Sequence, residues 1–393
     1  MKKLAKLLFA TVIAGSLLFS VTAFAAPESV TVIGSGWENS TYDSETGVLS
    51  NGSYEFKVTI SGTEFTVDYS SPVTAANVVI PESFTYNDVS YTCTAVGSYL
   101  LAGSSSTPNE SVTSLYIPAT IATYKDHAFR KCTALKTVTF EDRTKTIAEG
   151  QYIFSECSSL EEITLPTAYD NINKATFNKC SNLKSVTLSH NTTTIGAYAF
   201  QLCTSLKEIV LPANVSKIDS EAFLQAGLER VICIGTSRLN TIGKKVFGGT
   251  PLKELIFTNP TAPKTMNATS FVKVPENMVV YYPYNAAGYD KSTFVASGLA
   301  ETAQLVPCGG YIINISKNAE NTVVNYGIIN EESIALIALY DSNGVMTDVK
   351  SLTNTEDSVI FDTTDAAKAK IFTWESIASA KPFGVSYEYT VNN

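Results

Sequence analysis

Residues 194–212 read TIGAYAFQLCTSLKEIVLP, and the same frame recurs along the middle of this 393-residue chain. The phenylalanine of this stretch has counterparts spaced 23 to 25 residues apart. The series comprises Phe129, Phe154, Phe177, Phe200, Phe223, Phe247 and Phe271. Each is followed by a short apolar run, here Leu206, Ile209 and Leu211. A period of this length indicates a repeat protein, so the repeat decides the fold.

The spacing within one repeat predicts its local structure. Ile209 and Leu211 are two residues apart, which is the period of a strand with one buried face. The segment before each run, such as Ser220–Phe223, begins with a helix-capping residue type, so we expect a short helical or 3₁₀ turn there. One such unit cannot bury its own apolar side, but stacked units can. We therefore predict a mainly β, right-handed solenoid with a parallel sheet along one side.

The repeat also resembles a known family. The pattern I-G-x-x-A-F-x-x-C-x-x-L-x-x-I-x-L-P of Ile195–Pro212 is similar to the BspA-like leucine-rich repeats of bacterial surface proteins. The resemblance covers about residues 76–290, and Asn77–Pro81 resembles the opening strand of that family. The copies depart from the pattern in places, for example where Ala226 replaces the Cys. The resemblance implies an exported protein whose repeats form a binding scaffold, and it implies adhesion to host matrix proteins or coaggregation as roles found in the family.

The first 25 residues have the pattern of a secretory signal peptide. Three lysines precede an apolar stretch, Leu7–Val21, and Ala23-Phe24-Ala25 is a small-x-small cleavage site. A membrane anchor is the alternative, but Gly15 and Ser16 interrupt the apolar run, which is also short for a span of about 20 residues. We expect a protein that is secreted or held at the cell surface, without membrane insertion after signal cleavage.

The remaining chain divides into four predicted regions. Residues 26–75 alternate polar and apolar side chains and are expected to form β-hairpins that cap the solenoid, which covers 76–295. We expect a linker at 296–310, around Pro307-Cys308-Gly309-Gly310. Short strand-like runs in 311–393 predict a small β-sandwich of immunoglobulin or fibronectin type. This last region is also similar to an accessory module of secreted clostridial-type proteins.

Composition and motifs argue against nucleic acid as a partner and against catalysis. The net charge is −9 and no Lys/Arg run is present, so nucleic acid is not an expected partner. We find no G-x-S-x-G, Gly-rich phosphate loop or paired-His zinc motif, and the chain has only two His. Glu162, Glu208 and Glu254 share one repeat position, but we interpret them as solvated surface or part of a binding face. We therefore expect no enzyme and no cofactor.

Four of the seven cysteines occupy one repeat position: Cys132, Cys157, Cys180 and Cys203. A sister repeat has Ala226 there, which indicates a small buried group. We favour a column of reduced thiols, with disulfides as the alternative. Metal binding is disfavoured, since C-x-x-C spacing is absent.

The solenoid sheet should display the residue between the two buried positions of each strand. These residues are Tyr116, Thr139, Thr164, Thr187, Val210, Ile232, Ile256 and Tyr281. The second half of the series is apolar, which is typical of an interface. One hypothesis is an external docking patch formed by Val210, Ile232, Ile256 and Tyr281. The alternative is ordinary β-forming residues, or residues that the C-terminal domain covers.

The favoured function is therefore non-catalytic protein recognition or adhesion through the concave sheet. The candidate partner-binding residues are Tyr116, Glu162, Glu208, Val210, Ile232, Glu254, Ile256 and Tyr281. An extracellular or host protein is the expected partner. A glycan-binding module, with Tyr116 and Tyr281 stacking on sugars, and a structural component of the cell envelope remain the alternatives.

Overall fold

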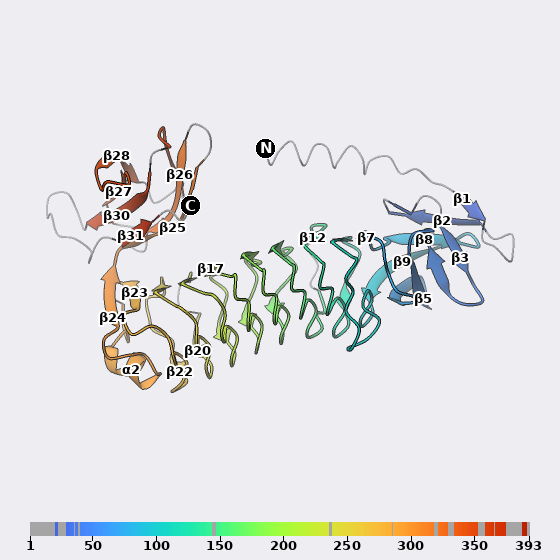
Figure 1. Cartoon of the computed structure of the whole chain (residues 1–393), viewed down its shortest axis with the longest axis horizontal. Coiled ribbons are helices and arrows are strands. Elements are labelled where there is room, and N and C mark those ends of the chain that lie inside the picture. The colour runs from blue at the N-terminus through green and yellow to red at the C-terminus, as the bar shows by residue number, and fades with distance from the viewer. Residues whose placement is uncertain are drawn as a thin grey trace. The chain divides into compact units, whose positions relative to one another are not determined.

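The computed structural model divides into two compact units, Met1–Leu206 and Lys207–Asn393. Figure 1 labels the helices and strands along the chain. It describes residues 20–22, 29–34, 36–37, 40–143, 147–235, 238–284, 286–317, 321–328, 334–352, 358–364, 366–374 and 387–390. The boundary between the units falls inside the repeats, not at the expected linker. The predicted signal peptide, 1–25, lies outside the described residues except for β1 (Ser20–Thr22), which pairs antiparallel with β2 (Ser29–Ile33).

The first unit begins with a sheet in the order β1-β2-β8-β9-β6-β5-β4-β3. Its further strands are β3 (Thr41–Asp43), β4 (Val48–Ser50), β5 (Glu55–Ser61), β6 (Glu64–Tyr69), β8 (Ser83–Tyr86) and β9 (Val89–Val96). Trp37, Phe56 and Phe84 form its buried aromatic core. The cap extends past residue 75, because the β8–β9 hairpin joins it. β9 also pairs in parallel with β11 (Thr123–Tyr124), which connects the cap to the first coils.

The solenoid part of the first unit has one parallel sheet in the order β15-β13-β12-β10-β7. Its strands are β7 (Asn77–Val79), β10 (Ser114–Ile117), β12 (Thr137–Phe140), β13 (Glu162–Thr164) and β15 (Ser185–Thr187). A second row of two-residue strands includes β14 (Asn171–Ile172) and β16 (Thr194–Ile195). Between the rows, buried phenylalanine rings stack with centroids 5.4, 5.7 and 5.3 Å apart, from Phe129 through Phe154 and Phe177 to Phe200. The predicted solenoid is confirmed, and its interior is an aromatic column.

The segment before each strand is a series of turns, where we expected a short helical or 3₁₀ turn. Two residues per coil adopt positive φ angles, for example Tyr198 at 60° and Leu202 at 61°. The cysteine that follows is buried, and its thiol donates to the backbone carbonyl of the preceding coil's phenylalanine. The Sγ–O distances are 3.2 Å from Cys157 to Phe129, 3.1 Å from Cys180 to Phe154 and 3.1 Å from Cys203 to Phe177. In these three coils the slot thus holds a small buried side chain that also donates a hydrogen bond.

In the second unit the coils form a parallel sheet in the order β17-β19-β21-β23-β24. Its strands are β17 (Glu208–Leu211), β19 (Arg230–Cys233), β21 (Glu254–Phe257), β23 (Val279–Pro283) and β24 (Gln304–Cys308). The opposite row contains β18 (Lys217–Ile218), β20 (Thr241–Ile242) and β22 (Thr265–Met266). A short helix, α2 (Lys291–Ala296), is capped by Asp290, whose side chain accepts from the Thr293 amide. Residues 296–310, expected as a linker, thus contain β24, which extends the solenoid sheet to Cys308 because it pairs in parallel with β23.

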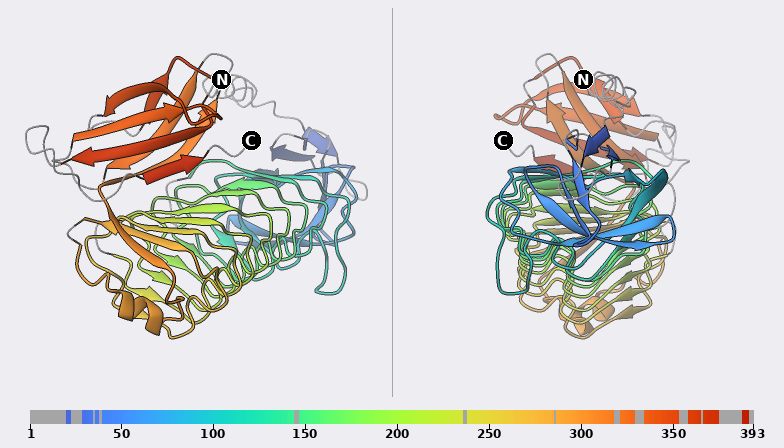
Figure 2. Two further views of the ribbon diagram at one scale, coloured as in Figure 1. Left: turned by 60° about the vertical axis from the view of Figure 1, so that its left-hand side comes forward. Right: turned by 90° about the vertical axis from the view of Figure 1, so that its right-hand side faces the viewer.

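Two antiparallel sheets form the C-terminal part of the second unit (Figure 2). One has the order β25-β26-β29, and the other has the order β28-β27-β30-β31. The strands are β25 (Gly310–Lys317), β26 (Thr322–Ile328), β27 (Ile334–Tyr340), β28 (Met346–Leu352), β29 (Ser358–Phe361), β30 (Lys368–Trp374) and β31 (Tyr387–Thr390). Val324 and Phe361 of the first sheet share a buried core with Ile337, Leu339 and Ile371 of the second. The two sheets therefore enclose one buried core, and we call this part of the unit the sandwich.

Candidate functional site

The regular stacking of the first unit is interrupted at the coil that contains Phe154. The phenylalanine spacing is widest here, because Phe154 follows Phe129 by 25 residues. β10 and β12 are paired along all of Ser114–Ile117, but β12 and β13 share only the pair Thr137↔Glu162. β13 and β15 are again fully paired. β12 and β13 therefore separate after Thr137 and Glu162.

A cavity of about 590 Å³ opens where β12 and β13 separate. We call it the β12–β13 groove. Its lining includes buried Val138 and Ile163 together with the outward-facing Thr139 and Thr164. Residues from both faces of β12 and β13 line the groove, because the two strands have separated at this point. The groove therefore reaches from the displayed face toward the interior of the coil.

The walls of the groove combine hydroxyl, carboxylate and aromatic groups. Thr167 lines the groove, and its hydroxyl lies within hydrogen-bond distance of two acceptors, Asp142 Oδ1 (3.2 Å) and the Arg143 carbonyl (2.8 Å). Phe140 lines the groove and packs edge-on against the buried Tyr169, with ring centroids 6.3 Å apart. A surface with fixed hydroxyls beside an aromatic wall suits a polar ligand that also has an apolar side chain.

A second, smaller hollow of about 430 Å³ adjoins the groove and shares Thr137 and Glu162 with it. Lys184 and Glu161 form an ion pair at its rim, with Nζ 2.7 Å from Oε2. The Lys184 ammonium, as hydrogen-bond donor and nearby charge, holds the pKa of Glu161 below its usual range. The hydroxyl-rich groove therefore has charges of both signs beside it.

The same coil carries a buried carboxylate that the sequence analysis missed. Glu149 stands five residues before Phe154, the position that holds Ile172, Ile195 and their counterparts in other coils. Both of its carboxylate oxygens are buried, and neither accepts a well-formed hydrogen bond from the residues that the structure describes. Burial raises the pKa of Glu149 to about 9, with a further contribution from Asp170, while the Asn171 amide lowers it. An alignment of the coils on their phenylalanines would have revealed Glu149, because it places this carboxylate at a position that is otherwise apolar.

Two of the predicted partner-binding residues lie in the first unit. Glu162 is exposed on β13 and lines the groove. Tyr116 is half-buried on β10, and the pKa of Tyr116 is raised to about 12 by burial and then by the nearby Glu141 and Glu82. The outward positions Thr139 and Thr164 line the groove as well. The open part of the predicted face in this unit is thus polar.

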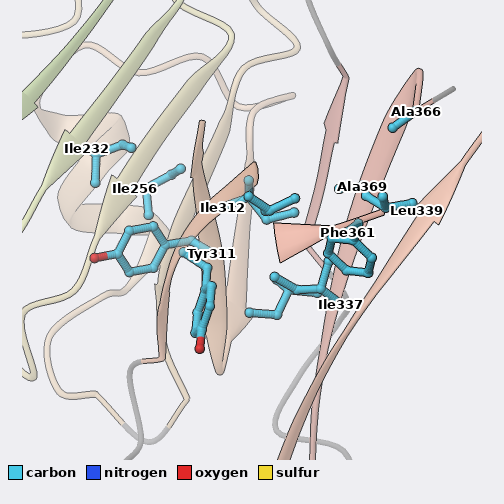
Figure 3. Packing of buried hydrophobic residues seen from close by; sticks show 12 residues of the cluster. Ile232, Ile256, Tyr311, Ile312, Ile337, Leu339, Phe361, Ala366 and Ala369 are labelled. Atoms are coloured by element: carbon cyan, nitrogen blue, oxygen red, sulfur yellow. The ribbon is translucent and has the colours of Figure 1, made fainter. Parts of the chain in front are cut away.

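The apolar half of the predicted face is covered within the second unit. Ile232 and Ile256 are fully buried, in a cluster with Tyr311 and Ile312 of β25 (Figure 3). Val210 and Tyr281 are partly buried and pack against the same cluster. The hypothesis of an external docking patch is therefore wrong for Ile232 and Ile256, because the sandwich covers the stripe. Strand alternation identified the displayed side chains but could not show what lies over them.

The carboxylates of Glu208 and Glu254 are also not simple solvated surface. Both form ion pairs with Arg230, whose side chain is 8% exposed, at 2.8 and 3.3 Å. The Arg230 guanidinium also donates to the carbonyls of Ile312 and Ile313 and lies 4.7 Å from the ring of Tyr389. Sequence reasoning missed Arg230. This residue lies in the coil between the two glutamates and occupies the same repeat position as they do.

Within the described ranges, no group of three or more His, Cys, Asp or Glu side chains is placed to hold a metal ion. Across the same part of the chain, no helix is long and apolar enough to cross a membrane.

Comparisons with known proteins agree with the repeat architecture. The family model described as the BspA type leucine rich repeat region matches six copies, in ranges 102–229, 150–276 and 195–302. No curated protein matches the chain.

Similar solved structures include a leucine-rich repeat protein from Bacteroides ovatus, with 17% identity over 65% of this chain and 89% of that chain, at a TM-score of 0.35. The leucine rich repeat protein of T. pallidum has 19% identity over 63% and 96%, at a TM-score of 0.37. A leucine rich cell surface protein from Faecalibacterium prausnitzii has 17% identity over 66% and 94%, at a TM-score of 0.30. Because the family matches extend over residues 102–302, more than half of the sequence, the chain belongs to the BspA-type leucine-rich-repeat family.

Proposed function

We propose that this protein is a non-catalytic, extracellular binding scaffold that recognises a protein partner through the β12–β13 groove. The observation that carries the proposal is the separation of β12 and β13, which leaves an open groove in an otherwise continuous sheet. Repeat proteins present an extended surface whose exposed side chains differ from one protein to another while the backbone scaffold stays the same.

The partner that suits the groove is an extended polypeptide segment. Residues 138–140 of β12 lack register partners on β13 among the described residues, so their edge can accept an added strand. Thr139 and Thr164 supply hydroxyls to the partner's polar groups, and Phe140 supplies an apolar wall. Glu162 at the mouth favours a basic side chain on the partner.

The proposed location is the bacterial surface or the surrounding medium. The leader pattern in residues 1–25 supports export, and one similar solved structure is that of a cell surface protein. Host matrix proteins are therefore the first candidate partners.

Binding of the full chain to immobilised extracellular-matrix proteins, with a glycan array in parallel, tests this function. Thr164→Trp fills the groove, and Thr187→Trp is its matched control, because Thr187 is exposed at the same repeat position one coil further and does not line the groove. We expect saturable protein binding that Thr164→Trp weakens at least about tenfold while Thr187→Trp leaves it intact. Equal loss in both variants, or glycan binding without protein binding, contradicts the proposal.

A further inference from the structure

The sandwich of the second unit has one edge with an unusual concentration of exposed apolar side chains. Val345, Met346, Val349 and Ile360 are 45–61% exposed, and they make up four of the six large exposed hydrophobic residues in the described part of the chain. Three of them lie on or beside β28, and Ile360 lies on β29. β28 and β29 are each the last strand of their sheet, so the apolar residues lie along two neighbouring strand edges.

β28 is ordered as a strand but, among the described strands, pairs only with β27. A turn at its start fixes its direction, since the Asp341 carboxylate accepts hydrogen bonds from the amides of Asn343 and Val345. The Val349 amide donates to the carboxylate of Asp348 in its own strand (2.7 Å). The Val349 amide can exchange this hydrogen bond for one to a backbone carbonyl of an added strand. The seven-residue edge of β28 can therefore accept such a strand.

The sequence of this edge is complementary to itself. β28 reads Met-Thr-Asp-Val-Lys-Ser-Leu, with Val349 at its centre. An antiparallel copy centred on Val349 places Asp348 opposite Lys350, Thr347 opposite Ser351 and Met346 opposite Leu352. Opposite charges, hydroxyl pairs and apolar pairs directly across two strands are the combinations that stabilise an antiparallel ladder. A two-fold interface needs such self-complementarity. If one residue of the first copy contacts a second residue of the other copy, the reverse contact is also made.

Charged residues on an edge strand normally oppose unspecific pairing, and Lys350 fits that role. Its ammonium group donates to the Ile360 carbonyl (2.7 Å) and lies 5.4 Å from the ring of Phe361, at the rim of the sandwich core. An unrelated strand would leave Asp348 and Lys350 without opposite charges. A second copy in the Val349-centred register supplies both, so these charges select one partner and one register.

We infer that two copies of this chain associate through antiparallel pairing of their β28 edges, with Val349 on the two-fold axis. The exposed Val345, Met346 and Ile360 then border the joint. Such a dimer presents two binding faces at once, which increases the avidity for a surface that carries many partner molecules. The inference does not depend on the proposed function, because the association can be measured without any ligand.

Charge exchange across the joint tests this inference. In Asp348→Lys and in Lys350→Asp, each cross-strand pair carries like charges, so each variant alone should dissociate at least about tenfold more readily than the natural protein. An equimolar mixture of the two variants restores both opposite-charge pairs and should dimerise again, and so should the double variant D348K/K350D. Sedimentation velocity of the full chain over a range of concentrations measures the association.

Control variants test whether a loss of dimerisation results from changes at the β28 edge and not from changes elsewhere in the protein. Ile60→Lys changes an exposed apolar residue of the first unit and should leave the dimer unchanged. Val349→Lys places two ammonium groups at the axis and should give monomers without altering Asp348 or Lys350. Circular dichroism checks that each variant is folded. A natural protein that is monomeric at all concentrations, or a dimer that ignores the single charge changes, or a mixture that stays monomeric, overturns the inference.

Discussion

The guanidinium of Arg230 lies 2.8 Å from the carboxylate of Glu208, although the two residues occupy equivalent positions in neighbouring coils. Glu254 flanks Arg230 from the other side, at 3.3 Å. The three residues thus alternate in charge along one row of the sheet. The arginine then extends to the carbonyls of Ile312 and Ile313, so the row connects the solenoid strands to the sandwich within the second unit.

Replacing Arg230 by Met should destabilise the second unit. The substitution keeps the volume of the buried stem but leaves two carboxylates and two carbonyls without their donor. Because Glu208 and Glu254 are 29% and 27% exposed, water recovers part of the loss, and we expect about 2 kcal/mol rather than the larger cost of a fully buried pair. Calorimetric unfolding measures it. Lys253→Met is the control, since the side chain of Lys253 is 69% exposed in its pair with Glu229 and should change stability by less than about 0.5 kcal/mol. Equal effects of the two substitutions contradict the role of Arg230.

Replacing Ile232 and Ile256 together by Ser should lower stability, because both side chains are fully buried beneath β25. Loss of packing and burial of two hydroxyls should cost about 4 kcal/mol or more. The exposed Thr187→Ser should have almost no effect on the melting temperature. If the double variant melted like the natural protein but lost a ligand, the stripe would be a docking patch after all.

Replacing Phe177 by Ala should destabilise the first unit by about 3–5 kcal/mol. The Phe177 ring stacks between Phe154 and Phe200, at 5.7 and 5.3 Å, and the solenoid interior cannot readily collapse around the space it leaves. Chemical denaturation of the full chain measures the change. A loss below about 1 kcal/mol would place the ring outside the structural core.

Glu149 should make the stability of the first unit depend on pH. Its pKa is about 9 when folded against an ordinary value of 4.5, so between these values the folded state keeps a proton that the unfolded state releases. The free energy of unfolding should therefore fall as pH rises from about 4.5 to about 9. Glu149→Gln, which stays neutral, should show a flatter profile, whereas Glu162→Gln on the exposed strand face should not. Identical profiles for the natural protein and Glu149→Gln would show that this carboxylate is solvated.

The repeat sequence was sufficient to predict the solenoid and its parallel sheet. Period and strand alternation are local properties, and each coil has the same neighbours above and below, so a pattern in one coil determines the packing in the next. The cysteine slot was predicted as small and buried for the same reason. The hydrogen bond that Cys180 donates to the Phe154 carbonyl involves a backbone group of another coil and could not be predicted from spacing.

The irregular features required the tertiary structure. Two extra residues in one coil show that something must change, but not that β12 and β13 separate into a groove while Glu149 enters the interior. The apolar stripe around Ile232 could equally mark a docking face or an internal interface, because alternation along a strand says which side chains point outward and not what covers them. The sandwich that covers it is brought there by β24, which continues the sheet through the segment expected to be a linker. The sequence thus determined what repeats, whereas contacts between residues far apart in the chain determined which parts of the repeating surface remain open.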